Sequence, residues 1–302
     1  MSSFRLLTPA KLSAAAAGDM EVIRELDKHG LLPAPGEDAP AFARRLSQLA
    51  AALGELEAAL KKHPEYEVAP GMIISSKHRI GREITGEALQ VTSQLYDVRP
   101  EWVPGFFANE SGGIFWGGCA LSDPASNLTL FIIRKAFQKK QRILVYNRRE
   151  LMAHELTHAA HQALNDWFFE EYFAYRTASS PLRKFFGCCF IRQYDALGFL
   201  LPVLLLPVAQ ALNIFTALQM PMIIFWILAA VYPLFLTVRT LQINSAAARA
   251  EKFLRSMKIR NPAGILFRMT VSEIKMLARK QMPHGSDLRW QLLNERINNN
   301  RE

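Results

Sequence analysis

Cysteine is scarce in this chain, and its scarcity excludes one kind of architecture. Only three cysteines occur among the 302 residues, Cys119, Cys188 and Cys189. An odd and sparse count argues against the disulfide framework that holds small secreted domains together. Long linkers and internal repeats are missing as well. We therefore expect one compact unit whose stability does not depend on disulfides.

Charge is absent from one long stretch of the chain. No Asp, Glu, Lys or Arg occurs in residues 196–238, and residues 213–219 divide this stretch into segments 196–212 and 220–238. As helices these segments would span about 25 to 30 Å, close to the hydrocarbon thickness of a bilayer. The prolines in and beside them are better tolerated in a membrane than in a soluble core. We therefore expect a transmembrane hairpin within residues 193–243.

The charges on either side of this stretch predict its orientation. Arg183, Lys184 and Arg192 precede the hairpin and Arg239 follows it, whereas the connecting loop is uncharged. The positive-inside rule places both flanks in the cytoplasm, and the N-terminus lacks the apolar core of a signal peptide. We expect a two-pass integral membrane protein of the bacterial inner membrane, with both termini and any active site cytoplasmic.

The chain is basic, and its positive charge lies mainly near the C-terminus. The formal net charge is +9, and residues 239–302 contain 13 Lys and Arg against 5 Asp and Glu. Such a segment fits the anionic lipid of a cytoplasmic membrane surface. Nucleic acid would be the competing partner, but no recognised nucleic-acid motif is present. The expected partner of this segment is therefore the lipid bilayer.

The sequence His154-Glu155-Leu156-Thr157-His158 is an H-E-x-x-H motif. Residues four apart share one face of a helix, so both imidazoles can bind a single Zn²⁺. Glu155 would lie about 100° round the helix, placed to take a proton from water. The flanking residues are helix formers without internal Gly or Pro. The motif predicts Zn²⁺ as cofactor, His154 and His158 as ligands, and Glu155 as catalytic base.

The third ligand is expected from the helix that follows. His161 and Leu164 stand where an H-E-x-x-H-x-x-G-x-x-H pattern needs Gly and His, so that pattern is absent. Asn165 and Asp166 can end the first helix and cap the next. Glu171 would then project from its first turns, with Glu170 as the alternative ligand. His161 shares the face of the ligands, but a packed histidine is the favoured interpretation.

These residues resemble the gluzincins, zinc peptidases with H-E-x-x-H and a glutamate in an E-x-x-A context on the next helix. The resemblance covers His154, Glu155, His158, Glu171 and Ala174, whereas Tyr175 stands where membrane-embedded members commonly have Asp. It implies an α+β fold, with a mainly helical zincin-like peptidase domain and a small β-sheet. The expected mechanism uses Glu155 to activate a zinc-bound water.

The donor that would stabilise the reacting carbonyl oxygen is left open by the sequence. Possible donors are Tyr172, Tyr175, Arg176 and Tyr194, and none of them is favoured over the others.

Strands are expected just before the metal-binding helix, at residues 112–121, 128–133 and 142–146. In the gluzincins an edge strand pairs with extended substrate, and the run 114–120 is our candidate for it. The expected substrate-binding residues are Ile114, Phe115, Trp116, Gly117 and Gly118. An ordinary interior strand with glycines at bulges is an equal alternative.

The sequence divides into an N-terminal helical region (1–100), a zinc peptidase core (101–192), the hairpin (193–243) and a basic C-terminal helical region (244–302). The two terminal regions are expected to pack on the core, and the last also to lie along the bilayer. The predicted function is a membrane-anchored zinc endopeptidase that cuts protein or peptide substrates associated with the membrane. A membrane-anchored zinc-binding scaffold or regulator without activity is the alternative.

Overall fold

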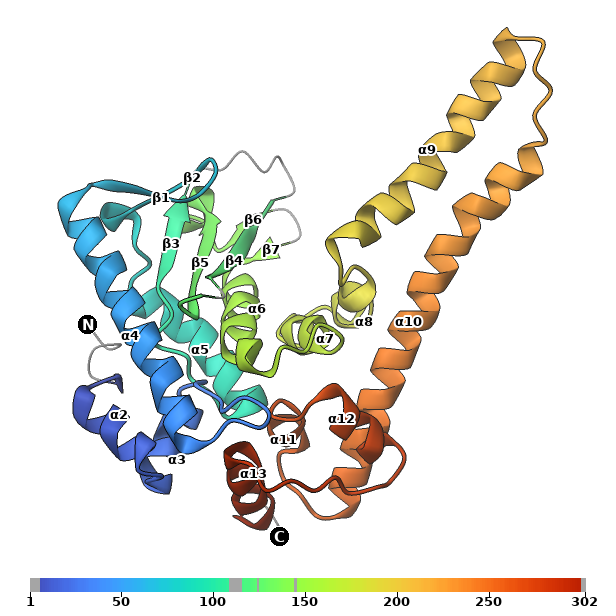
Figure 1. The fold of residues 1–302 in the computed structure, drawn as a ribbon. Helices are drawn as coiled ribbons and strands as arrows, with labels where there is room; N and C mark the ends of the chain where they lie inside the picture. The colour runs from blue at the N-terminus through green and yellow to red at the C-terminus, as the bar shows by residue number, and fades with distance from the viewer. Residues whose placement is uncertain (1–5, 109–115, 124, 144–145, 300–302) are drawn as a thin grey trace.

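A body of packed helices and small sheets makes up most of the molecule, and a long helical hairpin projects from it (Figure 1). The computed structural model describes residues 6–108, 116–123, 125–143 and 146–299. Helices outweigh strands, and the strands form small sheets. The mainly helical α+β class expected from the sequence is therefore confirmed.

The N-terminal part contains α2 (Pro9–Ala16), α3 (Met20–Lys28), α4 (Ala39–Lys62) and α5 (Arg82–Tyr96). Between α4 and α5 lies an antiparallel pair that the sequence analysis did not identify, β1 (Glu65–Ala69) and β2 (Met72–Ser75). Gly30, with a φ of 75°, brings the chain after α3 against Ala160 of the helix that carries the H-E-x-x-H motif. A Cβ at Gly30 would lie 2.9 Å from that of Ala160. The N-terminal part thus packs directly on the helix of the H-E-x-x-H motif.

The main sheet has the order β3-β5-β4, with β3 (Gly105–Ala108) parallel and β4 (Gly118–Asp123) antiparallel to the central β5 (Leu128–Arg134). Alternate β5 residues point to opposite faces. Phe131 and Ile133 pack in a core with the metal-binding helix, and Leu130 and Ile132 in another with α4. Both faces of β5 are therefore covered, and the strand expected at residues 128–133 is confirmed.

Two other strand predictions need correction. The strand expected over residues 112–121 begins at Gly118 within the described part, and residues 109–115 lie outside it. The strand expected over residues 142–146 is instead a small hairpin of β6 (Arg142–Ile143) and β7 (Tyr146–Asn147). The helix that follows starts directly after β7, because Asn147 caps it and its Oδ1 accepts from Arg149 N at 2.9 Å.

The next elements are α6 (Arg148–His161), α7 (Glu170–Tyr175) and α8 (Pro181–Phe186). Short 3-10 turns accompany them: η1 (Ser76–His78), η2 (Lys135–Gln138), η3 (Gln162–Leu164) and η4 (Gly187–Cys189). The loop from α6 to α7 follows the prediction. Asn165 is left-handed with a φ of 47°, and Asp166 Oδ1 accepts from Phe168 N and Phe169 N at 2.8 and 3.0 Å. Here α6 and α7 pack against each other.

The projecting hairpin consists of α9 (Gln193–Phe215) and α10 (Met222–Ser256). Both are long and apolar enough to cross a membrane, and only 6% and 11% of their apolar windows is buried within the molecule. At the tip, Asn213 closes the loop by bonding the backbone of Met220 through both side-chain atoms. The sequence placed the second segment at residues 220–238, but α10 continues to Ser256 because residues after Arg239 are also helix formers.

An ion pair closes the hairpin between Asp195 and Arg239, the charged residues that border its uncharged stretch. Asp195 Oδ2 lies 2.6 Å from Arg239 Nη2, and both side chains are largely buried. Tyr232 donates to Asp195 Oδ1 at 3.0 Å, and Arg239 also donates to the carbonyl of Cys189 at 2.6 Å. These contacts join α9, α10 and η4 at one level. The uncharged part of the hairpin begins directly beyond them.

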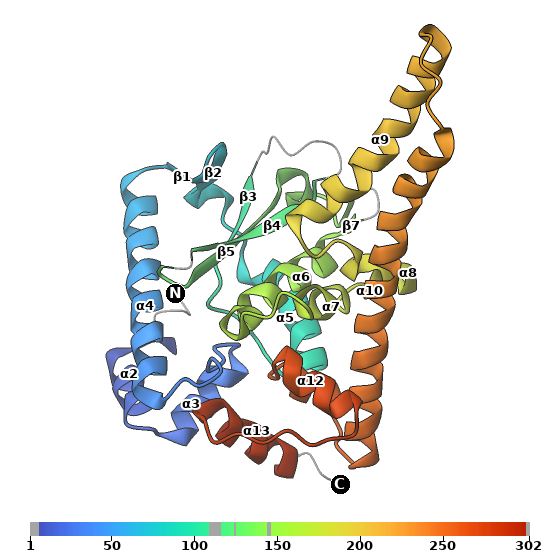
Figure 2. The same ribbon diagram turned by 45° about the vertical axis from the view of Figure 1, so that its right-hand side comes forward.

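The C-terminal part returns to the body as α11 (Pro262–Leu266), α12 (Val271–Ala278) and α13 (Leu288–Asn299) (Figure 2). It shares one hydrophobic core with α6 and α7. That core includes Ala160 and Phe173 near the metal-binding residues together with Ile243, Phe267 and Ile297. The region 244–302, which we separated in the sequence analysis, therefore begins inside a continuous helix and encloses the scaffold of the site.

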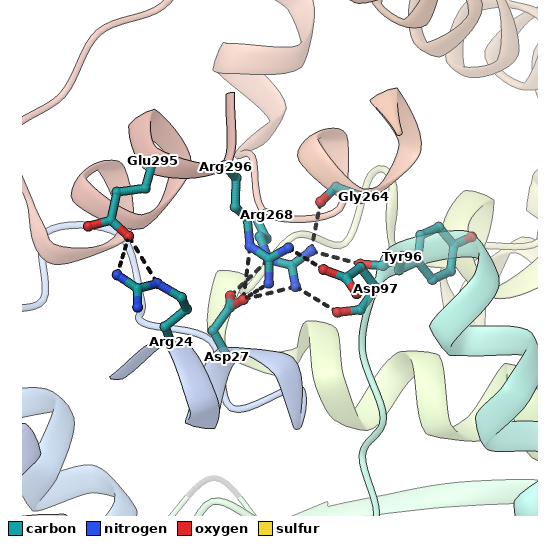
Figure 3. Close-up of polar contacts among 8 residues, drawn as sticks. All are labelled: Arg24, Asp27, Tyr96, Asp97, Gly264, Arg268, Glu295 and Arg296. Atoms are coloured by element: carbon teal, nitrogen blue, oxygen red, sulfur yellow. Dashed lines mark hydrogen bonds and ion pairs between the residues drawn. The ribbon is translucent and has the colours of Figure 1, made fainter. Parts of the chain in front are cut away.

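A buried ionic cluster joins the two ends of the chain (Figure 3). The Arg268 guanidinium bonds both carboxylate oxygens of Asp27, at 2.8 and 3.0 Å. It also donates to the carbonyls of Tyr96, Asp97 and Gly264. Arg296 is a second partner of Asp27. All five N–H donors of Arg268 are thereby used, as its burial requires.

Candidate metal centre

The H-E-x-x-H motif lies on α6, as its helix-forming flanks predict. His154 and His158 are one turn apart, and their Nε2 atoms are separated by 3.1 Å. Glu171 of α7 faces them, with carboxylate oxygens 3.7 Å from His154 Nε2 and 3.6 Å from His158 Nε2. The structure thus brings together the two histidines and the glutamate that the sequence singled out.

These three residues could hold a metal ion, and their chemistry suits zinc. The ligand atoms of His154, His158 and Glu171 all lie within 4.8 Å of one another. Zinc bonds of about 2.0 to 2.2 Å in a tetrahedron place the ligand atoms roughly 3.3 to 3.6 Å apart. The two Nε2 atoms are 3.1 Å apart, and the nearest Glu171 oxygen to each is at 3.7 Å (Oε2 to His154) and 3.6 Å (Oε1 to His158), close to that spacing. Three protein ligands would leave a fourth position for water.

Glu170, the alternative ligand of the sequence analysis, has a different position. Its Oε1 lies 2.8 Å from His158 Nδ1, the ring nitrogen that points away from the ligand cluster. A carboxylate there orients the imidazole and fixes its tautomer. Burial alone would lower the pKa of His158, but this bond and the charges of Glu171 and Glu155 outweigh burial and raise the pKa to about 9.

His154 has a different environment, although it lies in the same cluster. Burial and the neighbouring His158 hold the pKa of His154 well below its ordinary value, and a hydrogen bond with the backbone of Ala174 opposes them. The small side chain of Ala174 is fully buried. α7 therefore supplies the metal-facing carboxylate together with partners for both histidines.

Glu155 lies beside the cluster without joining it. Its side chain is buried, and burial together with the charge of Glu171 raises its pKa to about 7. The backbone N–H of Ala120 on β4 donates to it and opposes that rise. A carboxylate with a pKa near neutrality can both accept and return a proton. Glu155 thus lies between the cluster and strand β4.

Strand β4 presents a row of backbone groups next to this carboxylate. The carbonyl of Gly117 accepts from Arg134 N at 3.0 Å, so Gly117 bonds toward β5. Backbone groups alternate in an antiparallel pair, so Gly118 and Ala120 turn theirs to the other side. No described strand pairs with that edge.

The predicted substrate-binding residues are only partly placed by the structure. Ile114 and Phe115 lie outside the described residues. Trp116 packs against a hydrophobic core, and the carbonyl of Gly117 is already bonded to β5. Within the predicted run, the edge that no described strand pairs with begins at Gly118. It includes Ala120, which the prediction did not name as a binding residue and whose N–H donates to Glu155.

Among the four possible donors to a reacting carbonyl, only Tyr175 adjoins the ligands. The Tyr172 hydroxyl accepts from Arg176, and Arg176 pairs with Glu251. Tyr194 stands 66% exposed at the start of α9. The ring of Tyr175 packs edge-on against that of His154, with centroids 4.6 Å apart.

The surroundings of Tyr175 hold its ring in place and keep its hydroxyl protonated. Its other side is covered by Gly187, where a Cβ would lie 2.0 Å from the ring. Burial and the charge of Glu171 raise the pKa of Tyr175 to about 12. The phenol is therefore a donor at neutral pH.

Tyr175 also lines a cavity of about 860 Å³ between α6, α8 and the β6–β7 hairpin. Other residues around it are Arg142, Tyr146, Glu150, Leu182, Arg183 and Phe186. Arg183 is paired with Glu150 at 3.0 Å and lies over the ring of Tyr146. The sequence analysis did not identify Tyr146 or this pair, because they meet only when β7, α6 and α8 are folded together.

His161 packs in the core and contributes nothing to the ligand cluster. Its ring lies between Phe173 and Phe267, with centroid distances of 5.1 and 4.9 Å. Neither ring nitrogen has a hydrogen-bond partner among the described residues. Burial lowers the pKa of His161 to about 4, so the ring is neutral at physiological pH.

The chain was also compared with known proteins. No protein-family model, curated protein or solved structure matches it.

Proposed function

We propose that this protein is a membrane-anchored zinc endopeptidase that hydrolyses peptide bonds at the cytoplasmic membrane surface. The convergence of His154, His158 and Glu171, with the uncoordinated Glu155 beside them, is the observation that supports it. A zinc ion bound there would lower the pKa of a coordinated water and polarise the scissile carbonyl. The resemblance of these residues to the gluzincins supports the same assignment.

The chain's own groups would divide the chemistry between them. Glu155 takes a proton from the attacking water and returns it to the leaving amine. The Tyr175 hydroxyl donates to the carbonyl oxygen as negative charge develops on it. The free edge of β4 pairs with the extended substrate backbone, so that side-chain pockets determine sequence preference.

The hairpin supports the proposed location. Its two apolar helices are long enough to cross a bilayer, and the positive charges before Asp195 and from Arg239 onward favour a cytoplasmic position for both flanks. Since α8 and η4 join the metal-binding helices to the hairpin, the site is expected at the cytoplasmic face of the bacterial inner membrane. Its substrates would be membrane-associated proteins or peptides.

Metal content and cleavage of a peptide library, measured on the same detergent-solubilised protein, test the proposal. We expect about one zinc per chain, lost in His154→Ala and His158→Ala. Glu155→Gln should keep the metal and abolish cleavage, since the base moves protons without holding the ion. His63→Ala, at an exposed histidine far from the motif in sequence, is the matched control and should change neither. Full cleavage by Glu155→Gln would contradict the mechanism.

A further inference from the structure

The connection between α8 and α9 exposes large apolar side chains at regular spacing. Leu182, Phe186, Phe190 and Tyr194 are 69%, 50%, 49% and 66% exposed. They follow one another at every fourth residue, from α8 through η4 into the first turn of α9. We refer to these four side chains as the connection patch. Large apolar side chains gathered in so short a segment mark a surface that another phase or molecule covers.

The position of the patch identifies the bilayer as what covers it. In Figure 1, α8 lies beside the start of α9, and only η4 and residues 190–192 separate the two helices in the chain. The patch is therefore continuous along the chain with the exposed apolar surface of α9, whose apolar window is only 6% buried. A surface that continues a membrane helix is most simply covered by the same lipid.

Charged and aromatic neighbours of the patch match a lipid headgroup layer. Lys184 and Arg192 are exposed within the same segment. The guanidinium of Arg192 lies 4.2 Å from the ring centroid of Trp167, which is itself 49% exposed. Basic residues beside apolar ones are typical of segments that lie in an anionic interface, and Trp is enriched at that depth.

The patch also borders the cavity beside the metal-binding residues. Leu182 and Phe186 line this cavity together with Tyr175, whose ring rests on His154. One apolar surface therefore extends from the first membrane helix to the side of the ligand cluster. A polypeptide segment that lies in the interface would meet this cavity without first entering bulk water.

We propose that the connection patch is a second membrane contact, separate from the hairpin, which inserts into the headgroup region of the cytoplasmic leaflet. The cavity next to Tyr175 then opens on the lipid surface and receives substrate segments that emerge from the bilayer. The lipid contact is independent of catalysis, whereas the substrate route rests on the proposed peptidase function.

Photocrosslinking of the full-length protein in lipid vesicles tests the contact. Photoreactive p-benzoylphenylalanine would replace Phe186 in the patch, Leu204 in the middle of α9, or Ile73 on β2. Ile73 is the matched control because its exposure of 48% is similar to the 50% of Phe186. It lies on β2, which is away from the hairpin in both views. The vesicles contain phosphatidylethanolamine with a minority of phosphatidylglycerol, and the readout is covalent attachment of phospholipid by mass spectrometry.

We expect lipid adducts at positions 186 and 204 and only background at position 73. Adducts at 204 with background at 186 would overturn the second contact while leaving the hairpin in the membrane. Background at both 186 and 204 would contradict the membrane assignment itself. Crosslinks from position 186 to a second copy of the chain would show that self-association, and not lipid, covers the patch.

The substrate route has its own readout. One peptide is offered free in solution and anchored to the vesicle, and the ratio of anchored to free cleavage rates is compared between the wild type and Phe190→Ser/Tyr194→Ser. We expect the ratio to fall several-fold in the double variant, because the cavity would no longer be held at the lipid surface. An unchanged ratio, with lipid adducts still present at position 186, would contradict the substrate route and leave the lipid contact of the connection patch supported. Absence of cleavage in the wild type would instead contradict the proposed function.

Discussion

Two adjacent glutamates at the start of α7 have different positions at the candidate metal centre. Glu171 faces the Nε2 atoms of both histidines, whereas Glu170 bonds Nδ1 of His158 from the far side of the ring. Adjacent helix residues point about 100° apart. In the proposed site, one turn of α7 would therefore supply a ligand and a group that orients another ligand.

The two glutamates should be separable by substitution. Glu171→Ala removes a ligand and should abolish stoichiometric zinc binding. Glu170→Ala removes only the partner of His158 and should weaken affinity by about 10-fold to 100-fold. Glu170→Gln keeps an acceptor oxygen and serves as the conservative control, with a smaller loss. Zinc affinity measured by chelator competition distinguishes the variants. A greater loss of affinity in Glu170→Ala than in Glu171→Ala would show that Glu170 is the ligand.

Tyr175 is expected to act through its hydroxyl. Tyr175→Phe keeps the ring against His154, so zinc content should not change, while kcat should fall by about 10²-fold to 10³-fold, as for removal of one oxyanion donor. Tyr172→Phe is the matched control, because that hydroxyl bonds Arg176 away from the ligands. Equal kcat values for Tyr175→Phe and wild type, at equal zinc content, would show that the Tyr175 hydroxyl takes no part in the reaction.

At the scale of elements, the hairpin is joined to the body by the Asp195–Arg239 pair. Its two side chains are 4% and 10% exposed. Removing one member of a buried pair leaves an uncompensated charge and costs about 3 to 5 kcal/mol, whereas an apolar replacement of both is often tolerated. The pair therefore holds the relative position of α9 and α10 more than it adds net stability.

This leads to a double-mutant prediction. Asp195→Ala should lower the free energy of unfolding by about 3 kcal/mol or more, and Asp195→Ala/Arg239→Met should recover part of that loss. Thermal unfolding in detergent, followed by circular dichroism, measures both. A double variant whose loss equals the sum of the two single losses would show that the residues are not coupled.

Elements with strong local signals could be predicted from the sequence. The H-E-x-x-H helix, the Asn165–Asp166 turn and the apolar helices depend on residues close in the chain, and the structure contains all three. The predicted bounds of β4 were wrong, and so was the single strand predicted where β6 and β7 lie. Strand formation depends on partners that the local sequence does not identify. The contact between Tyr175 and Gly187 likewise exists only in the folded molecule.

At the scale of the whole molecule, residues near the two termini share one buried cluster. Asp27 of α3 pairs with Arg268 and Arg296, and Arg24 with Glu295 at 2.8 Å. Burial would raise the pKa of Asp27, but the charges of Arg268 and Arg296 outweigh it and lower that pKa below its ordinary value of 3.8. The cluster is therefore stable only while Asp27 stays ionised.

The cluster predicts a pH dependence of stability. Because the folded-state pKa of Asp27 is depressed, its contribution is fully present above about pH 4 and is lost as pH falls through the folded pKa. Asp27→Asn should lower stability at pH 7 by about 3 kcal/mol, and its difference from wild type should shrink toward pH 3. Urea unfolding from pH 7 to pH 3 measures this, with Glu65→Gln at an exposed position of β1 as control. A constant difference at every pH would contradict the assignment.

Topology is the second prediction for the whole molecule. Reporter fusions at Ser3, near Lys258 and at the C-terminus should all report the cytoplasm, and one in the loop 213–219 should report the outside. Two crossings force the flanks to the same side, and the positive charges choose that side. A C-terminal reporter outside with an N-terminal reporter inside would leave only one helix in the membrane.

The order of the chain also constrains how the protein is made. The core that encloses Ala160 and Phe173 includes Phe267 and extends to Ile297, and the ribosome releases those residues only after the hairpin. Newly made α6 and α7 therefore lack their covering helices until the hairpin has left the ribosome. During biosynthesis, the scaffold of the candidate metal centre is thus completed only after the hairpin has been made.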